Sequence, residues 1–373
     1  MESKQYPYFI KATISLFGII LFIFCLFTLR DELVPLAFAG IFAILLNPLL
    51  VRLQRYKIPR VLAILITLLI ALILFGGIMY FLSSQIARFG EAIPELKKRL
   101  TSLITDGERW LRDSFGIATD KQAEMVNQAI EKSKGMVGDT VSSVLGTVGV
   151  TLLLPIYIFL LLFYKPLILN FLFEVFAEEN SKQVADILNQ TKSSVQSYMV
   201  GLLLEALIVA VLNSAALLIL GVKYAILFGV IGALLNMLPY IGGLIAIILP
   251  VLMSLATNND YTTPLLVIAA YAIIQFIDNN FLVPRIVSSK VKINSLISIV
   301  VVLLGNALWG ISGMFLSIPF VAILKIIFDR IEHLRPWGKL LGDEVPTHHK
   351  GEIWNRFRKK RPSVAEKITQ NTA

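Results

Sequence analysis

The sequence predicts an all-α integral membrane protein with about eight membrane segments, of which two are re-entrant helical hairpins, plus a polar helical-hairpin insertion. Of its 373 residues, 56% are hydrophobic and only 16% are charged, whereas a soluble domain carries about 25% charged residues. Apolar runs of about twenty residues, the length that crosses a bilayer, recur along the chain. Basic residues gather beside these runs, as topology signals do.

The first unit, residues 1–82, contains three predicted membrane spans. Apolar runs long enough to cross the bilayer occupy 10–29, 33–50 and 61–82. The connector 51–60 has no acidic residue and carries a group of basic ones: Arg52, Arg55, Lys57 and Arg60. By the positive-inside rule, this connector and the N-terminus lie in the cytoplasm.

The second unit, residues 83–146, is a polar insertion in which acidic and basic residues are balanced. Apolar residues recur in it at intervals of three and four, first over 86–103 and again over 126–144. Two such stripes predict an antiparallel helical hairpin whose apolar seams face each other or a neighbouring subunit. The alternation of the spans places this insertion outside the cytoplasm.

The third unit, residues 147–328, is a membrane core that begins with two further spans, at 148–164 and 201–220. An amphipathic helix over 180–199 runs directly into the second of them. Residues 225–237 make a helix too short to cross a bilayer. Together with 241–256 they predict a hairpin, residues 225–256, that enters and leaves the membrane by the same face.

The core continues with a span over 264–283 and a second predicted hairpin over 293–328. Pro250 closes the first hairpin and Pro319 closes the second. A weak internal repeat with broken helices is typical of transporters.

The fourth unit, residues 329–373, is a basic tail that we place in the cytoplasm. It ends in a cluster that suits an anionic lipid surface: Arg356, Arg358, Lys359, Lys360 and Arg361. The net charge of +9 therefore reflects topology and membrane lipid, and we expect no nucleic-acid partner.

The stretch 236–285 combines helix breakers with polar side chains inside apolar sequence, which hydrocarbon penalises unless protein or a water-filled cavity surrounds them. It is therefore the predicted site. The residues expected to line a substrate or ion pathway are Glu205, Asn236, Pro239, Tyr240, Gly242, Gly243, Gln275, Asp278, Asn279, Asn280 and Arg285. Three glycines mark the second hairpin: Gly305, Gly310 and Gly313.

The charged candidates each have two interpretations. Asp278, in a polar stripe with Tyr271 and Gln275, either binds a cation or shuttles a proton, or is an interfacial carboxylate paired with Arg285 or a lysine. Glu205 is either a second ion-binding carboxylate or a side chain near the cytoplasmic interface. Arg285 is either a counter-ion or a positive-inside anchor.

The uncharged candidates are equally open. The turn 239–243 exposes backbone groups that, with the dipoles of the half-helices, can hold an ion or a small polar solute, or it is a tight turn packed against protein. Asn213 and Asn236 line the same path or form interhelical hydrogen bonds. The three hairpin glycines fit packing better than ligand contact.

Several enzyme classes are excluded. Cys25 is the only cysteine and the three histidines all lie in the C-terminal tail, which argues against a thiolate metal site or a zinc hydrolase. The chain has no phosphate-cradling loop of the GxxxxGK[ST] type. We therefore expect no enzyme and no cofactor other than a transported Na⁺ or H⁺.

Four stretches carry a resemblance to a known family: LNPLLVRLQRYKIPR (46–60), GVIGALLNMLPYIGGLIAIILP (229–250), FIDNNFLVPRIVSSKVKINSL (276–296) and GNALWGISGMFLSIP (305–319). The chain resembles the autoinducer-2 exporter family of bacterial inner-membrane transporters, the PerM-like permeases, over essentially its whole length. The shared positions are Pro239, Tyr240, Gly242, Asp278, Asn280, Pro284, Arg285, Gly305, Gly310, Gly313 and Pro319. Many members carry Glu where this chain has Asp278.

The resemblance implies a transporter with about eight membrane segments that forms a homo-oligomer, such as a pentamer, with 147–328 as its transport core. Some relatives are associated with export of autoinducer-2 and others with sodium or lithium/proton antiport. Three hypotheses follow: export of a small polar solute, cation/proton antiport using Asp278 and Glu205, and a non-transporting scaffold built on the insertion. The scaffold alone predicts that deleting 86–144 abolishes function while Asp278→Asn does not.

Overall fold

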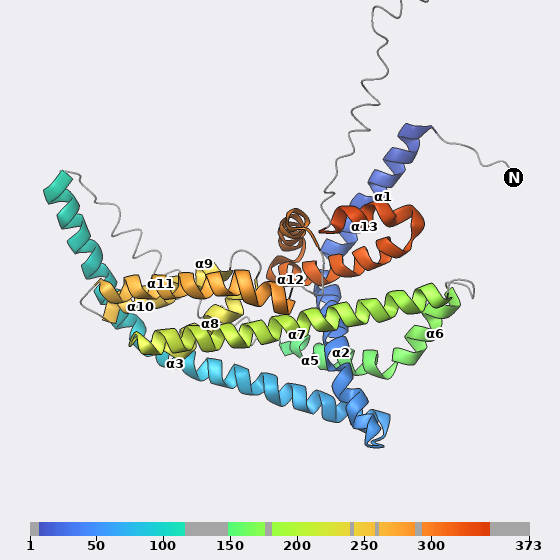
Figure 1. The fold of residues 1–373 in the computed structure, drawn as a ribbon, viewed down its shortest axis with the longest axis horizontal. Coiled ribbons are helices and arrows are strands. Elements are labelled where there is room, and N and C mark those ends of the chain that lie inside the picture. The colour runs from blue at the N-terminus through green and yellow to red at the C-terminus, as the bar shows by residue number, and fades with distance from the viewer. Residues whose placement is uncertain are drawn as a thin grey trace, which may run out of the picture.

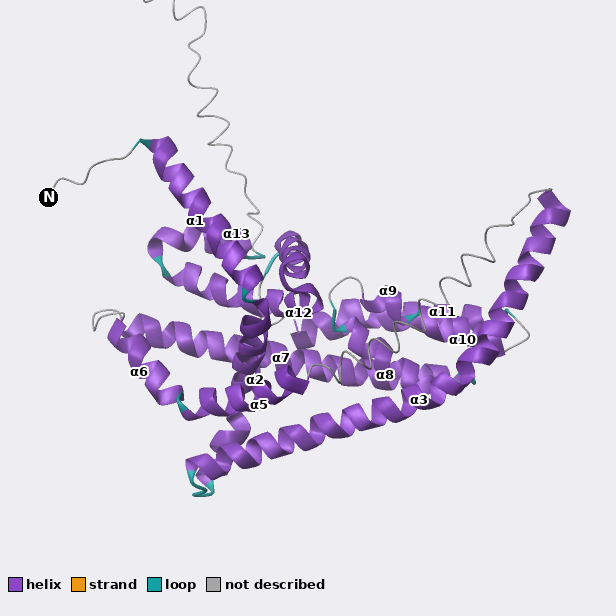
Figure 2. Ribbon diagram, turned by 180° about the vertical axis from the view of Figure 1, so that it is seen from behind, coloured by secondary structure: helices purple, strands orange, loops and turns teal. Residues whose placement is uncertain are grey.

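The computed structural model describes residues 7–115, 148–175, 181–238, 242–257, 261–287 and 293–343. Within these ranges every regular element is a helix (Figures 1 and 2), which confirms the predicted all-α class. Six helices are long and apolar enough to cross a membrane, or seven if one bent pair forms a single span. The predicted count of about eight segments stays a prediction.

The N-terminal region forms three helices: α1 (Tyr8–Thr28), α2 (Arg30–Arg55) and α3 (Arg60–Phe115). Helix α3 continues without a break beyond its apolar part, Arg60–Glu91, and reaches the far end of the molecule past α10 (Figure 1). The first half of the predicted insertion therefore extends the third span directly. Its second stripe, 126–144, lies outside the described residues.

The central helices are α5 (Val148–Phe163), α6 (Lys165–Val175) and α7 (Ser181–Ile219). Helices α5 and α6 meet at an angle of 60°. Helix α7 joins the predicted amphipathic helix and the span that follows it into one rod of 39 residues. It packs against α2, α8, α11, α12 and the π-helix described below, so α7 is the central support of the molecule.

Two glycines allow other segments to approach α7 closely. A Cβ on Gly229 of α8 would lie 2.8 Å from the Cα of Ser214 in α7. A Cβ on Gly201 of α7 would lie 2.6 Å from the carbonyl oxygen of Ile286. Because neither glycine has a side chain, the backbones on both sides of α7 can come into direct contact with it.

The first predicted hairpin contains three short helices, α8 (Ala225–Asn236), α9 (Gly242–Ala246) and α10 (Ile248–Thr257). A single helix was expected over 241–256, but the structure interrupts it at Ile247. Pro250 explains this break, because proline lacks the N–H that would bond to the Ala246 carbonyl and its ring clashes with that carbonyl.

Helix α11 (Thr262–Ile277) continues directly into η2 (Asp278–Val287), a π-helix. Pro284 lies inside η2 and cannot donate to the carbonyl four residues earlier. The backbone accommodates this missing bond by widening, and such π segments are frequent at functional sites. The sequence predicted the span but not the change of helix type.

The second predicted hairpin is α12 (Ser295–Arg330), which turns back on itself at Trp309 and Gly310. Gly310 has φ 61° and ψ −144°, a conformation suited to glycine. The Ser317 hydroxyl donates to the carbonyl of Val301 at 2.9 Å, a contact across sixteen residues that a straight helix does not allow. The hairpin forms as predicted, and its entry and exit by one membrane face stays a prediction.

The chain then continues through η4 (Glu332–Leu334) and α13 (Arg335–Leu341). The backbone N–H of Asn294 donates to the Leu341 carbonyl at 3.1 Å, so α13 lies against the start of α12. Between α7, α2, η2 and the second half of α12 a cluster of buried residues forms the core beside the site: Ile41, Val195, Tyr198, Met199, Leu202, Val287 and Leu316.

Candidate functional site

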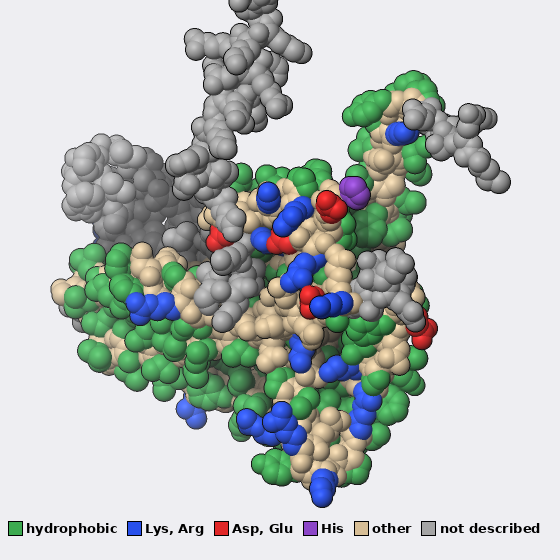
Figure 3. All heavy atoms as spheres, turned by 45° about the vertical axis from the view of Figure 1, so that its right-hand side comes forward, with side chains coloured by type: hydrophobic (Ala, Val, Ile, Leu, Met, Phe, Trp, Pro, Cys, Tyr) green, Lys and Arg blue, Asp and Glu red, His purple; other side chains and the backbone are tan. Residues whose placement is uncertain are grey.

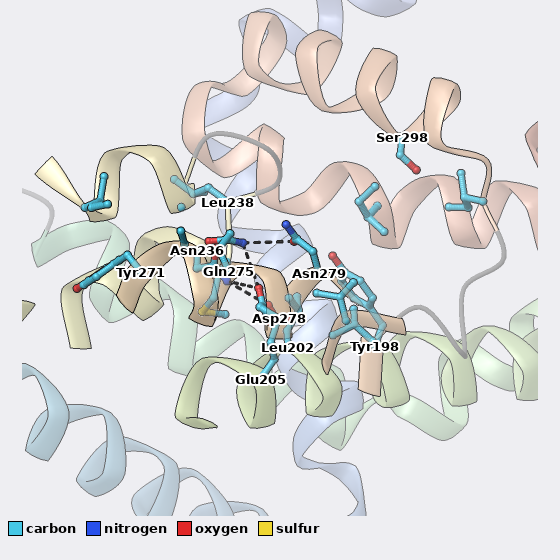
Figure 4. Close-up of a pocket in the computed structure, with 18 of the residues that line it drawn as sticks. Tyr198, Leu202, Glu205, Asn236, Leu238, Tyr271, Gln275, Asp278, Asn279 and Ser298 are labelled. Atoms are coloured by element: carbon cyan, nitrogen blue, oxygen red, sulfur yellow. Dashed lines mark hydrogen bonds between the residues drawn. The ribbon is translucent and has the colours of Figure 1, made fainter. Parts of the chain in front are cut away.

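A cavity of about 710 Å³ lies between α7, the tip of the first hairpin, α11, η2 and α12 (Figure 4). Its polar lining comes from residues far apart in the sequence, because α7 supplies one wall, α8 a second and α11 with η2 a third. The polar residues on its wall are Tyr198, Glu205, Asn236, Tyr271, Gln275, Asp278, Asn279, Ser298 and Asp343.

Asn236 joins the two carboxylates of this cavity. Its side-chain amide donates to Oδ2 of Asp278 at 2.8 Å and approaches Oε1 of Glu205 at 3.4 Å. One amide at the end of α8 therefore lies between a carboxylate on α7 and a carboxylate at the start of η2. The structure brings together three residues that the sequence had singled out in separate segments.

Gln275 extends this network along α11. Its side-chain amide lies 3.4 Å from Oδ2 of Asp278 and 3.3 Å from Oδ1 of Asn279. Figure 4 shows Asn236, Gln275, Asp278 and Asn279 gathered in the middle of the cavity, with Glu205 directly below Asp278 in the view. The polar stripe predicted on α11 thus faces the cavity.

The two carboxylates are deeply buried and have no basic partner among the lining residues that the structure describes. Glu205 is 4% exposed and Asp278 is 2% exposed. No Lys, Arg or His is found among the described residues that line the cavity. A buried carboxylate is costly unless it is paired, so this arrangement favours binding of a proton, a cation or a donor-rich solute.

Gly243 lines the cavity at the hairpin tip, and Gly242 precedes it in the chain. A Cβ on Gly243 would collide with Oε1 of Gln275 and lie 3.3 Å from Oδ1 of Asn236. A Cβ on Gly242 would collide with the carbonyl of Leu235. Pro239 and Tyr240, also predicted at this tip, lie outside the described residues.

Three predicted pathway residues that the structure describes are not part of the cavity lining: Gly242, Asn280 and Arg285. The Asn280 amide donates to the Phe276 carbonyl at 2.8 Å, which satisfies it within its own helix. Arg285 is exposed, and its guanidinium lies 5.9 Å from the centre of the Phe281 ring. This placement agrees with the alternative in which Arg285 anchors the helix end.

The hairpin glycines lie at the fold-back of α12 and not at the cavity. A Cβ on Gly305 would lie 2.5 Å from the Gly313 carbonyl oxygen, so the two halves of α12 pack backbone against backbone. Gly310 provides the turn. All three are placed as packing and turn glycines.

Four polar residues of the lining were not among the predicted pathway residues: Tyr198, Tyr271, Ser298 and Asp343. Of these, Tyr271 was named only as a member of the polar stripe around Asp278. Tyr198 lies within the predicted amphipathic helix 180–199, and its position seven residues before Glu205, two helical turns away, is a signal that could have identified it. Ser298 and Asp343 carry no such signal, because they reach the cavity only through the folding back of α12 and the docking of α13.

Comparison with known proteins identifies the family. The profile described as AI-2E family transporter matches residues 16–333. The AI-2 transport protein TqsA of Escherichia coli (strain K12) is 24% identical over 332 residues, which cover 88% of this chain and 95% of TqsA. YueF of Bacillus subtilis (strain 168), provisionally named a transport protein, is 26% identical over 321 residues, covering 80% of this chain and 84% of YueF.

A third relative, PerM of Escherichia coli (strain K12), is provisionally named a permease and is 27% identical over 228 residues, 60% of this chain and 63% of PerM. These relatives are transport proteins by name, and the family match over 16–333 includes both hairpins and every lining residue of the cavity except Asp343. With its apolar helices, the protein is a multi-pass membrane transporter, and the chain belongs to the AI-2E transporter family.

Proposed function

We propose that the protein is a secondary transporter that exports a small polar solute of the autoinducer-2 type across the bacterial cytoplasmic membrane. The observation that carries this proposal is the cavity of about 710 Å³ with its central group of amides and carboxylates. Binding sites for small molecules have volumes of about 300–1,000 Å³ and contain a few convergent polar groups in an apolar wall.

The chemistry of the lining suits a compact solute with several hydroxyl groups. The carboxylates of Glu205 and Asp278 accept hydrogen bonds from hydroxyls, and the amides of Asn236 and Gln275 both donate and accept. The apolar part of the wall, which includes Leu202, excludes water around the solute. Charge-assisted hydrogen bonds to the two carboxylates would supply most of the affinity.

The position of the cavity fits entry from the cytoplasm. Ser298 lies near the start of α12 and Asp343 lies just after α13, two ends that the positive-inside rule places on the cytoplasmic side. Asp343 is exposed, so the cavity reaches the surface there. A solute bound in this arrangement would be taken up from inside the cell and released outside.

The test measures binding and vesicle transport of autoinducer-2 by the purified full-length protein. Asp278→Asn and Glu205→Gln should each weaken binding about tenfold or more, because each removes a charged acceptor while keeping the shape. Gly76→Ala is the matched control, since nothing lies within 4 Å of that position. Wild-type protein that neither binds nor transports autoinducer-2 would exclude this solute.

Cation/proton antiport is the second candidate, and a specific observation favours it. Glu205 and Asp278 share the Asn236 amide, and the lining holds no basic residue among the described positions. Such a pair can exchange a proton for a cation. Liposomes holding a pH-sensitive dye should then report proton movement when Na⁺ or Li⁺ is added outside, and this movement should be lost in Asp278→Asn.

The surface of the molecule supports a membrane location. The proposal also places both termini in the cytoplasm, on the basis of the positive-inside rule. In Figure 3 hydrophobic side chains cover the left part of the view, and Lys and Arg side chains gather toward the centre and lower right. Helix α1 has no buried residue, so its apolar surface is free for lipid or for a second copy of the chain in a homo-oligomer.

A non-transporting scaffold remains the contrasting hypothesis. It predicts that deletion of 86–144 abolishes the biological function while Asp278→Asn leaves it intact. The proposal predicts that Asp278→Asn alone removes transport, even though the insertion is present.

A further inference from the structure

A second, much smaller cavity lies beside the large one, deeper along α7. Its volume is about 10 Å³, and residues of α7, α8, α9, α11 and η2 line it. Both cavities are lined by Asn236, Gly243, Tyr271, Gln275 and Asp278. A space of this size holds one water-sized particle, so it can accept an ion or a water molecule but not the solute of the large cavity.

Three of the residues that line the small cavity each carry a buried oxygen without a hydrogen-bond partner. These atoms are Oδ1 of Asn213, the hydroxyl oxygen of Tyr271 and Oδ1 of Asp278. The three residues are between 2% and 7% exposed. Buried polar atoms are nearly always satisfied, so three such oxygens around one small space indicate a ligand that binds oxygen.

Two amide oxygens lie next to the same space. Oδ1 of Asn236 is 3.3 Å from the position that a Cβ on Gly243 would take, and Oε1 of Gln275 lies even nearer to that position. Gly243 lines the small cavity, and its missing side chain leaves both oxygens accessible from it. The cavity therefore offers several oxygen ligands, one of them from a carboxylate.

The charged side chains in the described lining around Asp278 are all acidic, and the other titratable groups there are tyrosines. Helix α7 presents Glu205 and Tyr198, α11 presents Tyr271, and Asp343 follows α13 at the edge of the large cavity. The described lining of both cavities contains no Lys, Arg or His. A positive ligand would compensate this charge, whereas a neutral one would leave it uncompensated.

We infer that the small cavity is a binding site for a single dehydrated monovalent cation of about the size of Na⁺, held by Asp278, Asn213 and Tyr271. Oxygen ligands select hard cations. A Ca²⁺ ion takes six to eight oxygens and Mg²⁺ keeps several waters, whereas the described lining of this cavity supplies a single carboxylate and its volume of about 10 Å³ has no room for waters beside the ion. One monovalent ion fits both the space and the charge.

The ion site is linked to the solute cavity through Asp278. Oδ1 of Asp278 is the unpartnered oxygen, while Oδ2 accepts from Asn236, which also approaches Glu205. An ion bound to Oδ1 withdraws negative charge from the carboxylate. It thereby weakens the hydrogen bond that Oδ2 accepts from Asn236 at the wall of the large cavity. This coupling role rests on the proposed solute transport, whereas binding of the ion can be measured without any solute.

The test is equilibrium binding of radioactive Na⁺ to the purified full-length protein, with Na⁺ alone as the probe. Wild type should bind it saturably. Gly232→Ala should weaken this binding about tenfold or more, because its Cβ would lie 3.3 Å from Nδ2 of Asn213 and 3.5 Å from the Tyr271 hydroxyl, inside the small cavity. Gly76→Ala, with open space around it, should bind as wild type does.

Tyr271→Phe provides an independent check because it removes one oxygen without adding bulk. This variant too should weaken Na⁺ binding. An unfolding temperature equal to that of wild type would show that the loss does not come from misfolding. No saturable binding in wild type would overturn the inference and leave water as the occupant. Unchanged binding in both Gly232→Ala and Tyr271→Phe would also overturn it, because the ion would then lie elsewhere.

The outcomes for Na⁺ and for autoinducer-2 are separable. Protein that binds autoinducer-2 without binding Na⁺ contradicts the ion site and leaves the proposed export intact. Protein that binds Na⁺ without binding autoinducer-2 contradicts the proposed solute and supports the ion site.

Discussion

At the residue scale, Asn236 determines how the two carboxylates of the site are held. Glu205 and Asp278 come from different helices, and the amide of Asn236 lies within 3.4 Å of both. Neither carboxylate forms an ion pair with another described residue. The position of each acid therefore depends on an uncharged side chain at the end of a short helix.

The first prediction concerns Asn236→Leu. This change removes the donor to a buried carboxylate while keeping a similar volume, and a hydrogen bond to a charged group is worth about 1.5–3 kcal/mol. We expect a lower unfolding temperature in detergent and loss of solute binding. A variant as stable as wild type with intact binding would show that the amide does not hold the site together.

The second prediction compares two neighbouring glycines. Gly243→Ala meets the end of the flexible Gln275 side chain, which can move, whereas Gly242→Ala meets the rigid backbone of Leu235 and Asn236. We expect Gly243→Ala to fold and to show altered solute affinity, and Gly242→Ala to lower the yield of folded protein. Size-exclusion profiles and binding assays on the pair distinguish these effects, and identical behaviour would contradict the assignment.

At the element scale, breaks in helices are what place polar groups inside the membrane core. Pro250 separates α9 from α10, Pro284 accompanies the π-helix η2, and Gly310 reverses α12. Each break frees backbone groups or changes the direction of the chain. The breaks in the first hairpin and in η2 lie beside the cavity, where a bilayer protein tolerates irregular backbone, whereas the turn of α12 lies away from it.

The third prediction tests the turn of α12. Gly310 has a positive φ and open space around it, so Gly310→Ala introduces backbone strain without a clash. Strain of this kind costs about 1–3 kcal/mol, and the unfolding temperature should fall accordingly. Gly40→Ala in α2, also with open space but without positive φ, should be neutral. Equal effects of the two changes would contradict the hairpin turn.

The fourth prediction tests the π-helix. Pro284→Ala restores a backbone N–H within η2 and allows the segment to return to ordinary α-helical bonding. We expect transport to decrease while stability stays the same or rises, because the turn after Asp278 would change its register. Hydrogen exchange of the residues around 284 together with a transport assay would show this, and unaltered transport would indicate that the π segment is incidental.

At the scale of the whole molecule, the short helices pack against a frame of long helices, with α7 at its centre. Helix α7 contacts α2, α8, α11, α12 and η2, and the Arg330 guanidinium lies 3.3 Å from Asp186 near the start of α7. The Trp309 indole at the tip of α12 donates to the Leu26 carbonyl in α1 at 2.9 Å. The second hairpin is therefore tied at its tip to α1 and at its end to α7.

The fifth prediction tests the topology of this frame. In a Cys25→Ser background, Tyr56→Cys in the basic connector should react with a membrane-impermeant thiol reagent only from the cytoplasmic side. Ile219→Cys at the end of α7 should react only from outside. Both positions are highly exposed, so burial inside the protein would not prevent the reagent from reaching them. Labelling of both from one side would overturn the predicted arrangement of spans.

The sequence by itself determined the class of the molecule, because hydrophobic runs of spanning length, flanking basic residues and helix breakers report local physical constraints. It also indicated the site, since amides and carboxylates inside apolar sequence require a polar environment. The individual spans, the continuation of the amphipathic helix into α7 and the fold-back between Gly305 and Gly313 follow from such local signals.

Only the tertiary structure decided which of these polar residues meet. Asn236, Glu205 and Asp278 are 31 and 42 residues apart along the chain, and no periodicity relates them. Arg285 and Asn280 share a segment with Asp278 but do not line the cavity. For Arg285 the π-helix is the reason, because an α-helix would place it near the face of Asp278. The small cavity behind Asp278 exists because five elements pack around Gly232 and Gly243. Such a cavity depends on how distant segments pack together, which local sequence patterns do not predict.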